Sequence, residues 1–264
     1  MKILVCFKVI HDLEQITPAE LIALRDGSLN ISVYQQIFGS YDEGALETAL
    51  YFADMGRSMG KEIQVHAITV GSCESRFVKN LYALGFDEVF CLEANQDNTW
   101  NPEYTAGYIA AFAKSGRVYD LILTGKQTGP GESARIPRLI ARKLNLPCLS
   151  EVIELSPCDK GISALCKTDR GRCSLTLIHP AVCAIGEAAH SYLRVATLLE
   201  KLATASKELR SFRTENISLR SEIPQFQHYI FESKEKQCRM IDGADLDRSI
   251  HILWTEYLQK LVHL

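Results

Sequence analysis

The chain has 264 residues and a formal net charge of -3; 47% of its residues are hydrophobic and 23% are charged. This is the composition of an ordinary globular protein, and it excludes disordered and collagen-like chains. Because acidic and basic residues nearly balance, it also argues against a general nucleic-acid binder, which needs a clustered basic surface. A chain of this length can bury roughly three quarters of its unfolded surface, so a core can form without metals or disulfides.

Nothing in the sequence indicates membrane insertion. The longest apolar runs fall far below the roughly 18 residues that a spanning helix needs, and no signal-peptide pattern follows Met1. We therefore expect a cytoplasmic protein. The nine cysteines are an odd number without any CxxC pair, and most have apolar neighbours. This pattern predicts buried reduced thiols rather than zinc or iron–sulfur ligands.

Predicted strands and helices alternate along the first half of the chain. Short apolar runs rich in β-branched residues predict buried strands. These runs cover residues 2–10, 63–71, 88–92 and 120–125. Between them, apolar residues recur at helical spacing, with capping residues at the ends, which predicts helices. The helical segments cover residues 41–60, 72–85 with Ser72 as cap, 101–116 with Asn101 as cap, and a stretch beginning near Glu132 or Ser133.

This alternation predicts an α/β fold, with a mostly parallel sheet and helices on both faces in a Rossmann-like nucleotide-binding layout. From about Cys148, four short β-like runs follow, separated by turn residues. They are CLSEVIEL, ISALCKT, CSLTLI and PAVCAI. The last three could form a meander that finishes the same core.

After about Thr197 the composition shifts to mixed charge with little apolar periodicity, which predicts an extended arm. We therefore divide the chain into an α/β nucleotide-binding domain, residues 1–196, and a C-terminal arm and helix, residues 197–264. The final helix is amphipathic. Its apolar stripe comprises Ile250, Leu253, Trp254, Tyr257, Leu258 and Leu261. Since the arm lacks core-forming residues, contact of this stripe with a partner is favoured over folding back onto the chain's own sheet.

The segment from residue 120 to 147 carries the most informative pattern. A buried strand ends at Gly125, a loop of small residues follows, and a helix comes next. At the carboxyl end of a parallel strand, loop amides and a helix N-terminus favour an anion such as phosphate. The loop offers a positive charge on Lys126, side-chain donors on Gln127, Thr128 and Ser133, and close backbone approach at Gly125, Gly129 and Gly131. An ordinary strand-to-helix turn remains equally open, because the segment matches neither GxxxxGK[ST] nor GxGxxG.

The same segment, with its DLILTGKQT run, closely resembles the nucleotide loop of the electron-transfer flavoprotein β subunit family, which has GKQ or GRQ before an acidic loop. Other segments resemble that family in the same order along the chain. They are KILVCFKVIHD, YDEGALETAL, NLYALGFDEVF, HPAVCAI and CRMIDGADLDRSIHILWTEYL. The resemblance thus covers nearly the whole chain.

This resemblance implies a heterodimer in which an α subunit carries the redox-active FAD. The present chain would hold AMP or, as in electron-bifurcating members, a second FAD that accepts hydride from NADH, and electrons would be exchanged with a flavin-dependent dehydrogenase. No catalytic side chain is implied. The implied nucleotide contacts are Cys6, Gly39, Ser40, Tyr41, Asp42, Val70, Gly125, Lys126, Gln127, Thr128, Gly129, Pro130, Gly131, Glu132, Ser133, Ala134, Arg135 and Ile136.

The chain departs from the family at several of these positions. The family usually has Asn-Pro at Gly39–Ser40, an acidic pair at Pro130 and Glu132, and Gln at Arg135. At the helix start, Arg135 could instead pair with phosphate. These departures keep two alternatives open: a structural subunit that has lost its nucleotide, and a stand-alone adenine-nucleotide-binding protein of the same fold.

The family also has a loop that docks onto partner dehydrogenases, and SYLRVATL resembles it at Arg194 and Leu198 but lacks the usual Asn-Glu-Pro. A protruding Leu198 would fill a pocket of the partner. The alternative is that Leu198 simply starts a core-facing helix.

Overall fold

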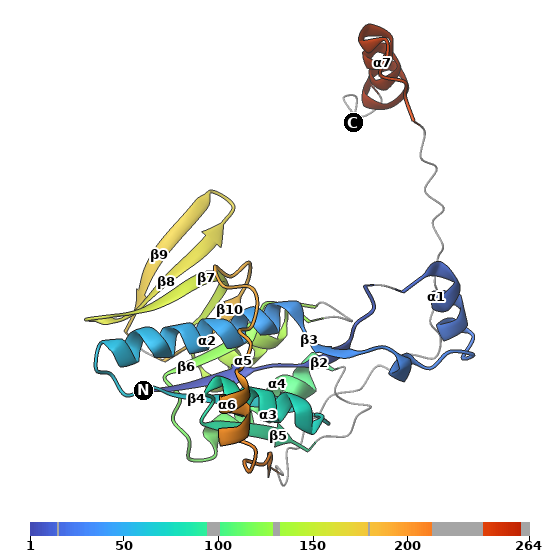
Figure 1. Ribbon diagram of the computed structural model, residues 1–264. Coiled ribbons are helices and arrows are strands. Elements are labelled where there is room, and N and C mark those ends of the chain that lie inside the picture. The colour runs from blue at the N-terminus through green and yellow to red at the C-terminus, as the bar shows by residue number, and fades with distance from the viewer. Residues whose placement is uncertain (15, 94–100, 129–132, 179, 213–239, 260–264) are drawn as a thin grey trace. The chain divides into compact units, whose positions relative to one another are not determined.

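The computed structural model (Figure 1) describes residues 1–14, 16–93, 101–128, 133–178, 180–212 and 240–259. The strands are β1 (Lys2–Cys6), β2 (Val9–His11), β3 (Gln36–Phe38), β4 (Gln64–Val70), β5 (Glu88–Leu92), β6 (Leu121–Gly125), β7 (Cys148–Cys158), β8 (Gly161–Thr168), β9 (Gly171–Leu177), β10 (Ala181–Ile185) and β11 (Arg210–Phe212). The helices are α1 (Pro18–Arg25), α2 (Ser40–Ser58), α3 (Ser75–Leu84), α4 (Pro102–Lys114), α5 (Ile136–Leu144), α6 (Leu198–Ala203) and α7 (Leu246–Leu253), with short helical turns η1 (Ile31–Val33) and η3 (Trp254–Leu258).

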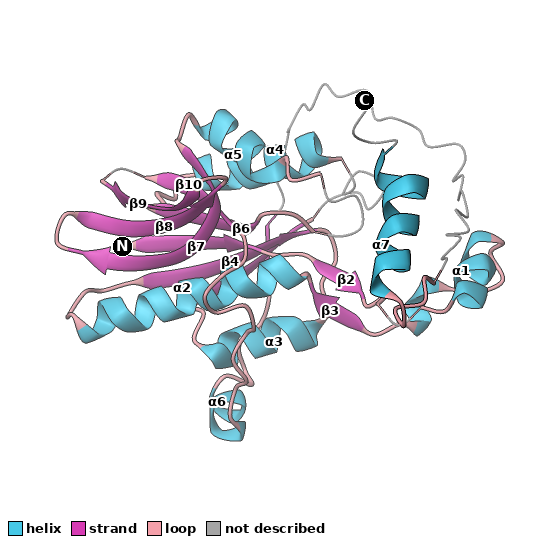
Figure 2. Ribbon diagram, turned by 90° about the horizontal axis from the view of Figure 1, so that it is seen from above, coloured by secondary structure: helices cyan, strands magenta, loops and turns pink. Residues whose placement is uncertain are grey.

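The chain forms two compact units, Met1–Pro224 and Gln225–Leu264. The first is built on a nine-stranded sheet with the order β11-β5-β4-β1-β6-β10-β7-β8-β9. All neighbours from β11 to β7 pair in parallel, and only the β7–β8 and β8–β9 pairs are antiparallel. Figure 2 shows α2 and α3 on one face of this sheet and α4 and α5 on the other. The predicted α/β fold is confirmed.

The central strands are buried on both faces because their side chains alternate between two apolar clusters. In β1, Ile3 and Val5 join the cluster under α2 and α3, whereas Leu4 and Cys6 join the cluster under α4 and α5. This explains why the predicted strands carry continuous apolar runs rather than an apolar–polar alternation.

The predicted meander is displaced by one strand. The antiparallel meander consists of β7, β8 and β9, while β10 lies between β6 and β7 and is parallel to both. Every residue of β10 is buried, whereas β9 is exposed along most of its length. A continuous apolar run such as AVCAI is typical of an interior parallel strand, and this preference overrides the proximity of β10 to β9 in the sequence.

Several predicted boundaries are wrong in detail. The first strand ends at Cys6, and Val9–His11 forms a separate two-stranded ribbon with β3. Glu74 rather than Ser72 precedes α3, and it makes no side-chain capping bond. Helix α5 starts only at Ile136, because Ala134 has a positive φ of 50° and Arg135 is the N-cap. The Asn101 cap of α4 is confirmed.

The region after residue 196 first contributes to the first unit. There α6 contacts α3, and β11 pairs with the edge strand β5. The second unit contains α7 and η3, so the predicted C-terminal helix is present. Its apolar residues Leu246, Ile250, Leu253, Trp254, Tyr257 and Leu258 are all exposed. The sixth residue of the predicted stripe, Leu261, lies outside the described residues.

Within the described residues, none of the helices combines the length and apolar character that a bilayer crossing requires. The eight described cysteines are all free thiols. Four of them are buried and three are partly buried, but Cys173 is exposed on β9, directly opposite Cys166 of β8. Cys238 lies outside the described residues.

Replacing Leu46 by Ala tests the assigned core. Leu46 is fully buried on α2, so its truncation should lower the free energy of unfolding by about 3 kcal/mol because neighbouring side chains fill the resulting cavity only in part. Urea unfolding followed by circular dichroism measures the loss. The matched variant Leu199→Ala removes the same atoms where the side chain is 79% exposed, and should change the free energy by at most about 0.5 kcal/mol. Equal losses in the two variants would contradict the assignment.

Candidate functional site

The candidate site lies where the carboxyl ends of β4, β1 and β6 meet. In register, Cys6 of β1 is opposite Ile68 of β4 and Thr124 of β6. The chain builds β4 and β5 on one side of β1 and then places β6 on the other side. In open α/β sheets, ligands bind at the carboxyl edge where the strand order reverses, and we call this edge of the sheet the crevice. The predicted contacts Cys6, Val70 and Gly125 therefore share one edge of the sheet.

The buried carboxylate of Asp42, in the first turn of α2, is the centre of this edge. Its Oδ1 accepts a hydrogen bond from the Gly125 amide at 3.2 Å. Its Oδ2 accepts one from the Lys8 amide at 3.1 Å and one from the Thr128 hydroxyl at 2.9 Å. Three donors of the protein therefore bond to the carboxylate oxygens of Asp42, a residue that the sequence analysis predicted as a nucleotide contact.

The electrostatics around Asp42 are dominated by loss of water. Burial raises the pKa of Asp42 to about 7, although the hydrogen bonds from Thr128, Lys8 and Gly125 oppose the rise. Burial also lowers the pKa of the Lys8 ammonium, while the nearby Asp42 charge acts in the opposite direction. The pKa of the Cys6 thiol is strongly raised, first by burial and then by Asp42. The carboxyl group of Asp42 thus titrates near neutral pH.

Two glycines fit around this carboxylate. A Cβ on Gly125 would lie 2.5 Å from Asp42 Oδ1 and 2.9 Å from the Asp42 amide nitrogen. A Cβ on Gly39 would lie 2.8 Å from Asp42 Oδ2 and 2.7 Å from the Thr128 methyl carbon. Gly125 was predicted to let the backbone approach a ligand, but in this structure the absent side chain makes room for Asp42.

The positive charge predicted for the loop is already paired. Lys126 Nζ lies 2.9 Å from Glu151 Oε1 of β7 and 5.3 Å from the centre of the Tyr41 ring. The hydrogen bond with Glu151 raises the pKa of Lys126. An anion at this position would compete with a carboxylate for the lysine. No local pattern in the sequence links Lys126 to Glu151.

Two features next to this crevice do suit an anionic, hydrogen-bonding ligand. Helix α5 starts without a side-chain cap and without an acidic residue in its first turn, so its first amides and partial positive charge favour an anion. Arg135, the N-cap residue, is 58% exposed and lies 3.7 Å from Glu103. The Thr124 hydroxyl is buried and has no hydrogen-bond partner among the described residues. Buried polar groups are nearly always paired, so this hydroxyl is suited to a ligand or water. Sequence reasoning had missed Thr124.

For the remaining predicted nucleotide contacts, the structure gives the position of some residues and does not describe the others. Ser40 and Tyr41 lie in the first turn of α2, and Gln127 follows β6 half-buried. Ser133 is exposed just before α5, and Ala134 has the left-handed backbone described above. The predicted loop residues Gly129, Pro130, Gly131 and Glu132 lie outside the described residues.

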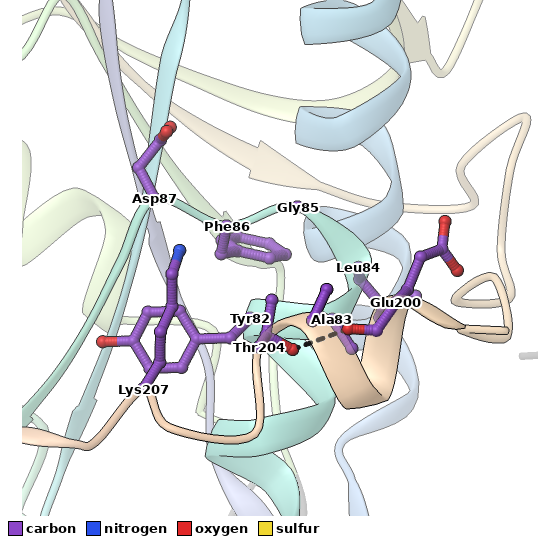
Figure 3. A pocket seen from close by; sticks show the side chains of 10 residues that line it. Tyr82, Ala83, Leu84, Gly85, Phe86, Asp87, Glu200, Thr204 and Lys207 are labelled. Carbon is purple, nitrogen blue, oxygen red and sulfur yellow. Dashed lines mark hydrogen bonds between the residues drawn. The ribbon is translucent and has the colours of Figure 1, made fainter. Parts of the chain in front are cut away.

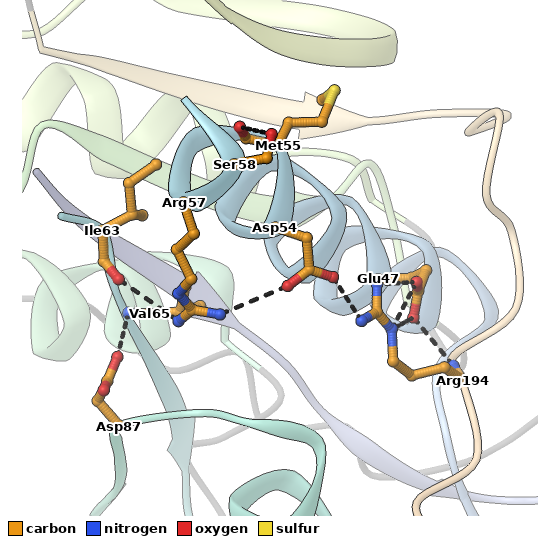
Figure 4. Close-up of polar contacts among 9 residues, drawn as sticks. All are labelled: Glu47, Asp54, Met55, Arg57, Ser58, Ile63, Val65, Asp87 and Arg194. Atoms are coloured by element: carbon orange, nitrogen blue, oxygen red, sulfur yellow. Dashed lines mark hydrogen bonds and ion pairs between the residues drawn. The ribbon is translucent and has the colours of Figure 1, made fainter. Parts of the chain in front are cut away.

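A second candidate surface surrounds Arg194, as Figure 4 shows. The Arg194 guanidinium donates to Glu47 Oε1 from Nε at 2.9 Å and from Nη2 at 2.8 Å, and to Asp54 Oδ2 from Nη1 at 2.7 Å. Its backbone amide also donates to Glu47 Oε2 at 2.9 Å. Since the Glu47 side chain is only 9% exposed, α2 holds the loop before α6 firmly in place.

Leu198, the first residue of α6 after this loop, lies on the protein surface. Leu198 is 71% exposed, and Leu199 and Leu202 are exposed as well. The core-facing alternative for Leu198 is therefore wrong in this structure: Thr197 caps α6 in a capping box with Glu200, and none of the helix residues is buried. A hydrophobic side chain held on the surface by a fixed loop is suited to contact with another protein.

Two cavities adjoin α6 rather than the carboxyl ends of β1, β4 and β6. One of about 420 Å³ lies between the end of α3 and α6, where Tyr82, Asp87, Glu200 and Lys207 line it (Figure 3). The other, of about 480 Å³, has Phe38 and Phe77 beside Arg76, Lys79 and Lys201. The first is next to the amino end of β5, so it is at the edge of the sheet opposite the crevice.

The fold and the position of the crevice define an α/β protein of Rossmann-like layout with a candidate ligand site at the reversal of strand order. Residues 33–208 match the model of the family described as "Electron transfer flavoprotein domain". The chain belongs to this family, as a divergent member of its β-subunit branch.

Three relatives illustrate the range of the family. YgcR of Escherichia coli K12, which carries the name of an electron transfer flavoprotein subunit, is 27% identical, with 98% of both chains covered. The caffeyl-CoA reductase-Etf complex subunit CarD of Acetobacterium woodii is 29% identical over 61% of this chain and 58% of its own. The electron transfer flavoprotein subunit beta of Megasphaera elsdenii is 29% identical over 56% of this chain and 54% of its own. The matches to the latter two thus span little more than half of those proteins.

The pH dependence of stability tests the state of Asp42. An Asp in an unfolded chain ionises near pH 4, whereas folding raises the pKa of Asp42 to about 7. The stabilisation from the protonated group is therefore complete below about pH 4 and is lost as the pH rises to about 7. Relative to Asp42→Asn, the wild-type free energy of unfolding should fall over this range and level off above it. Urea titrations at several pH values measure this difference, and a constant difference would contradict the raised pKa.

Hydrogen exchange tests the Arg194 contact with α2. In Glu47→Gln, the Arg194 amide faces a neutral and only half-matching partner, so its exchange should accelerate about tenfold. Asp54→Asn is the matched control: it weakens one exposed contact and leaves both Glu47 oxygens in place, so the acceleration should be much smaller. NMR or mass spectrometry measures the exchange rate of the Arg194 amide in each variant. Equal rates in both variants would mean that Glu47 does not hold the loop.

Proposed function

We propose that this chain is the β subunit of a heterodimeric electron transfer flavoprotein and holds an adenine nucleotide, FAD or AMP, in the crevice at the carboxyl ends of β1, β4 and β6. Its α partner carries the redox-active FAD. The heterodimer passes electrons between a flavin-dependent dehydrogenase and an acceptor. If the chain holds FAD, oxidation of NADH with electron bifurcation is the expected activity.

The observation that carries the nucleotide proposal is the pair of unsatisfied groups beside the crevice. The uncapped start of α5, with Arg135 exposed next to it, suits the phosphate of AMP or the diphosphate of FAD. The buried Thr124 hydroxyl offers a hydrogen bond to a polar group nearby. Bound FAD would supply a flavin that accepts and releases electrons, whereas AMP would supply no redox chemistry. The chain's own residues bind and orient the nucleotide.

Support for the partner proteins comes from two exposed apolar surfaces. Leu198 projects from a loop that Glu47 and Asp54 hold through Arg194, so a dehydrogenase pocket can receive it without much loss of loop entropy. In the second unit, six apolar residues of α7 and η3 are exposed and suit contact with an α subunit. The relative CarD is named as a subunit of a reductase–Etf complex, which accords with such assembly.

One observation favours a second candidate, a structural subunit without a nucleotide. Asp42 occupies the Gly125 amide and the Thr128 hydroxyl, and Glu151 pairs with Lys126. In this alternative, the protein's own carboxylates have taken the place of phosphate. The heterodimer would then contain only the FAD of the α subunit.

Nucleotide analysis of the heterodimer distinguishes these functions. The chain is co-expressed with its α subunit, the complex is denatured, and the released FAD and AMP are counted per heterodimer. Two FAD support the bifurcating form of the proposal, and one FAD with one AMP supports the conventional form. One FAD alone supports the structural subunit and contradicts the nucleotide proposal, while failure to form a complex contradicts the heterodimer.

Truncation of Leu198 tests the docking surface. With the purified heterodimer as electron acceptor, Leu198→Ala should raise the KM for the heterodimer in the dehydrogenase reaction about tenfold or more, since a central anchor contributes strongly to binding. The kcat at saturation should stay the same, because Leu198 lies outside the nucleotide crevice. Val118→Ala, at another exposed position, should leave KM unchanged. A lowered kcat without a change in KM would contradict a docking role.

A further inference from the structure

We propose that Asp42 is a positioning residue of the nucleotide site, which ties together the protein segments that form the crevice and does not itself contact the nucleotide. This inference rests on the proposed nucleotide binding. It revises the role that the family resemblance implies for this position, because it assigns the carboxylate to the protein and not to the ligand.

Donors of the protein itself use most of the hydrogen-bond acceptor positions of the Asp42 carboxylate. The Asp42 residue is 4% exposed, and its two oxygens accept the hydrogen bonds from Lys8, Gly125 and Thr128 described above. Gly39 and Gly125 leave no space for even a methyl group beside it. The described residues thus fill three of the roughly four acceptor positions of the carboxylate, and the side chain exposes almost no surface to a ligand.

The donors come from both sides of the crevice. Lys8 lies in the connection between β1 and β2, and its carbonyl accepts a hydrogen bond from the Gly39 amide at 3.0 Å, so this connection and the start of α2 are joined twice. Gly125 ends β6, and Thr128 stands in the segment that leads from β6 toward α5. One side chain on α2 thus fixes the segment after β1 to the segment after β6. Displacement of Asp42 would move the Gly125 amide and the Thr128 hydroxyl relative to the segment after β1.

The charge of Asp42 adds a second consequence. A phosphate bound near α5 would disfavour the ionised carboxylate, so nucleotide binding should be accompanied by proton uptake. The charged and titratable groups that face Asp42 are Lys8 from the β1–β2 connection and Cys6 from β1. Burial keeps the pKa of the Cys6 thiol far above neutral, and Lys126 beyond them is paired with Glu151. The pKa of Asp42 lies near 7, so this carboxyl group can take up the proton.

The test compares nucleotide affinity among variants of the heterodimer. The heterodimer is stripped of the nucleotide found in the wild type, and that nucleotide, FAD or AMP, is titrated back. Asp42→Asn and Thr128→Val should each weaken binding about tenfold, since Asn leaves one acceptor oxygen for three donors and Val removes the Thr128 donor. The matched control is Thr48→Val, which removes a buried threonine hydroxyl from the same helix, where it donates to the Gly44 carbonyl at 2.6 Å. It should bind like the wild type.

Two further readouts separate positioning from a direct contact or a loss of stability. If Thr128 acts through Asp42, the double variant should bind no more weakly than Asp42→Asn alone; additive losses would mean that Thr128 contacts the nucleotide independently and would overturn the role of Asp42 as its partner. Wild-type affinity should rise from pH 8 to pH 6 more steeply than that of Asp42→Asn, in which the titrating group is absent. Since the nucleotide is the same in both proteins, its own titration cancels.

The outcomes remain distinguishable. A wild-type heterodimer that binds neither FAD nor AMP in this subunit defeats the proposed function itself. If the wild type binds and both Asp42→Asn and Thr128→Val bind equally well, the function stands and the positioning role is wrong. A loss in Thr48→Val as large as that in Thr128→Val would also overturn it. Should Asp42→Asn fail to assemble, Thr128→Val measured against Thr48→Val still decides.

Discussion

A buried carboxylate bridging two backbone segments is the contact on which the functional edge of this protein depends. Parallel strands align their carboxyl ends, but nothing in strand pairing fixes the loops that continue beyond them. Here the first turn of α2 supplies that constraint through Asp42, which accepts hydrogen bonds from Lys8 on one side and from Gly125 and Thr128 on the other. These hydrogen bonds join the loops that flank the crevice, and the sheet aligns the strand ends below them.

The same edge shows how a divergent family member can alter a site without changing its fold. Carboxylates of the chain engage the Gly125 amide and the Lys126 ammonium, while the start of α5 and the Thr124 hydroxyl keep unused capacity. A phosphate in this site is therefore expected nearer to α5 than to Lys126.

Much of this architecture was accessible from the sequence, because buried parallel strands and capped helices leave local patterns. The Asn101 cap, the glycine after α3 and the strand before Gly125 were predicted for that reason. Long-range choices were not accessible. The insertion of β10 between β6 and β7 depends on which strand can bury both faces, and the pairing of Lys126 with Glu151 joins positions that no periodicity connects. Helix α1 was also missed, although the sequence displays its capping box of Thr17 and Glu20 and a proline, Pro18, at the first helical position.

The displaced meander has a consequence for handling the protein. Since β10 lies inside the sheet, β9 is an edge strand, and most of its side chains are exposed. Among the described residues, no strand pairs with the outer side of β9. Unpaired strand borders invite hydrogen bonding to a second chain, and natural proteins restrain this with charges and short lengths. Arg172 on β9 supplies a positive charge near the hairpin turn that would repel an identical copy, whereas Lys167 opposite it on β8 is paired with Glu187 at 2.7 Å. High salt would screen this repulsion and favour self-association of the isolated chain.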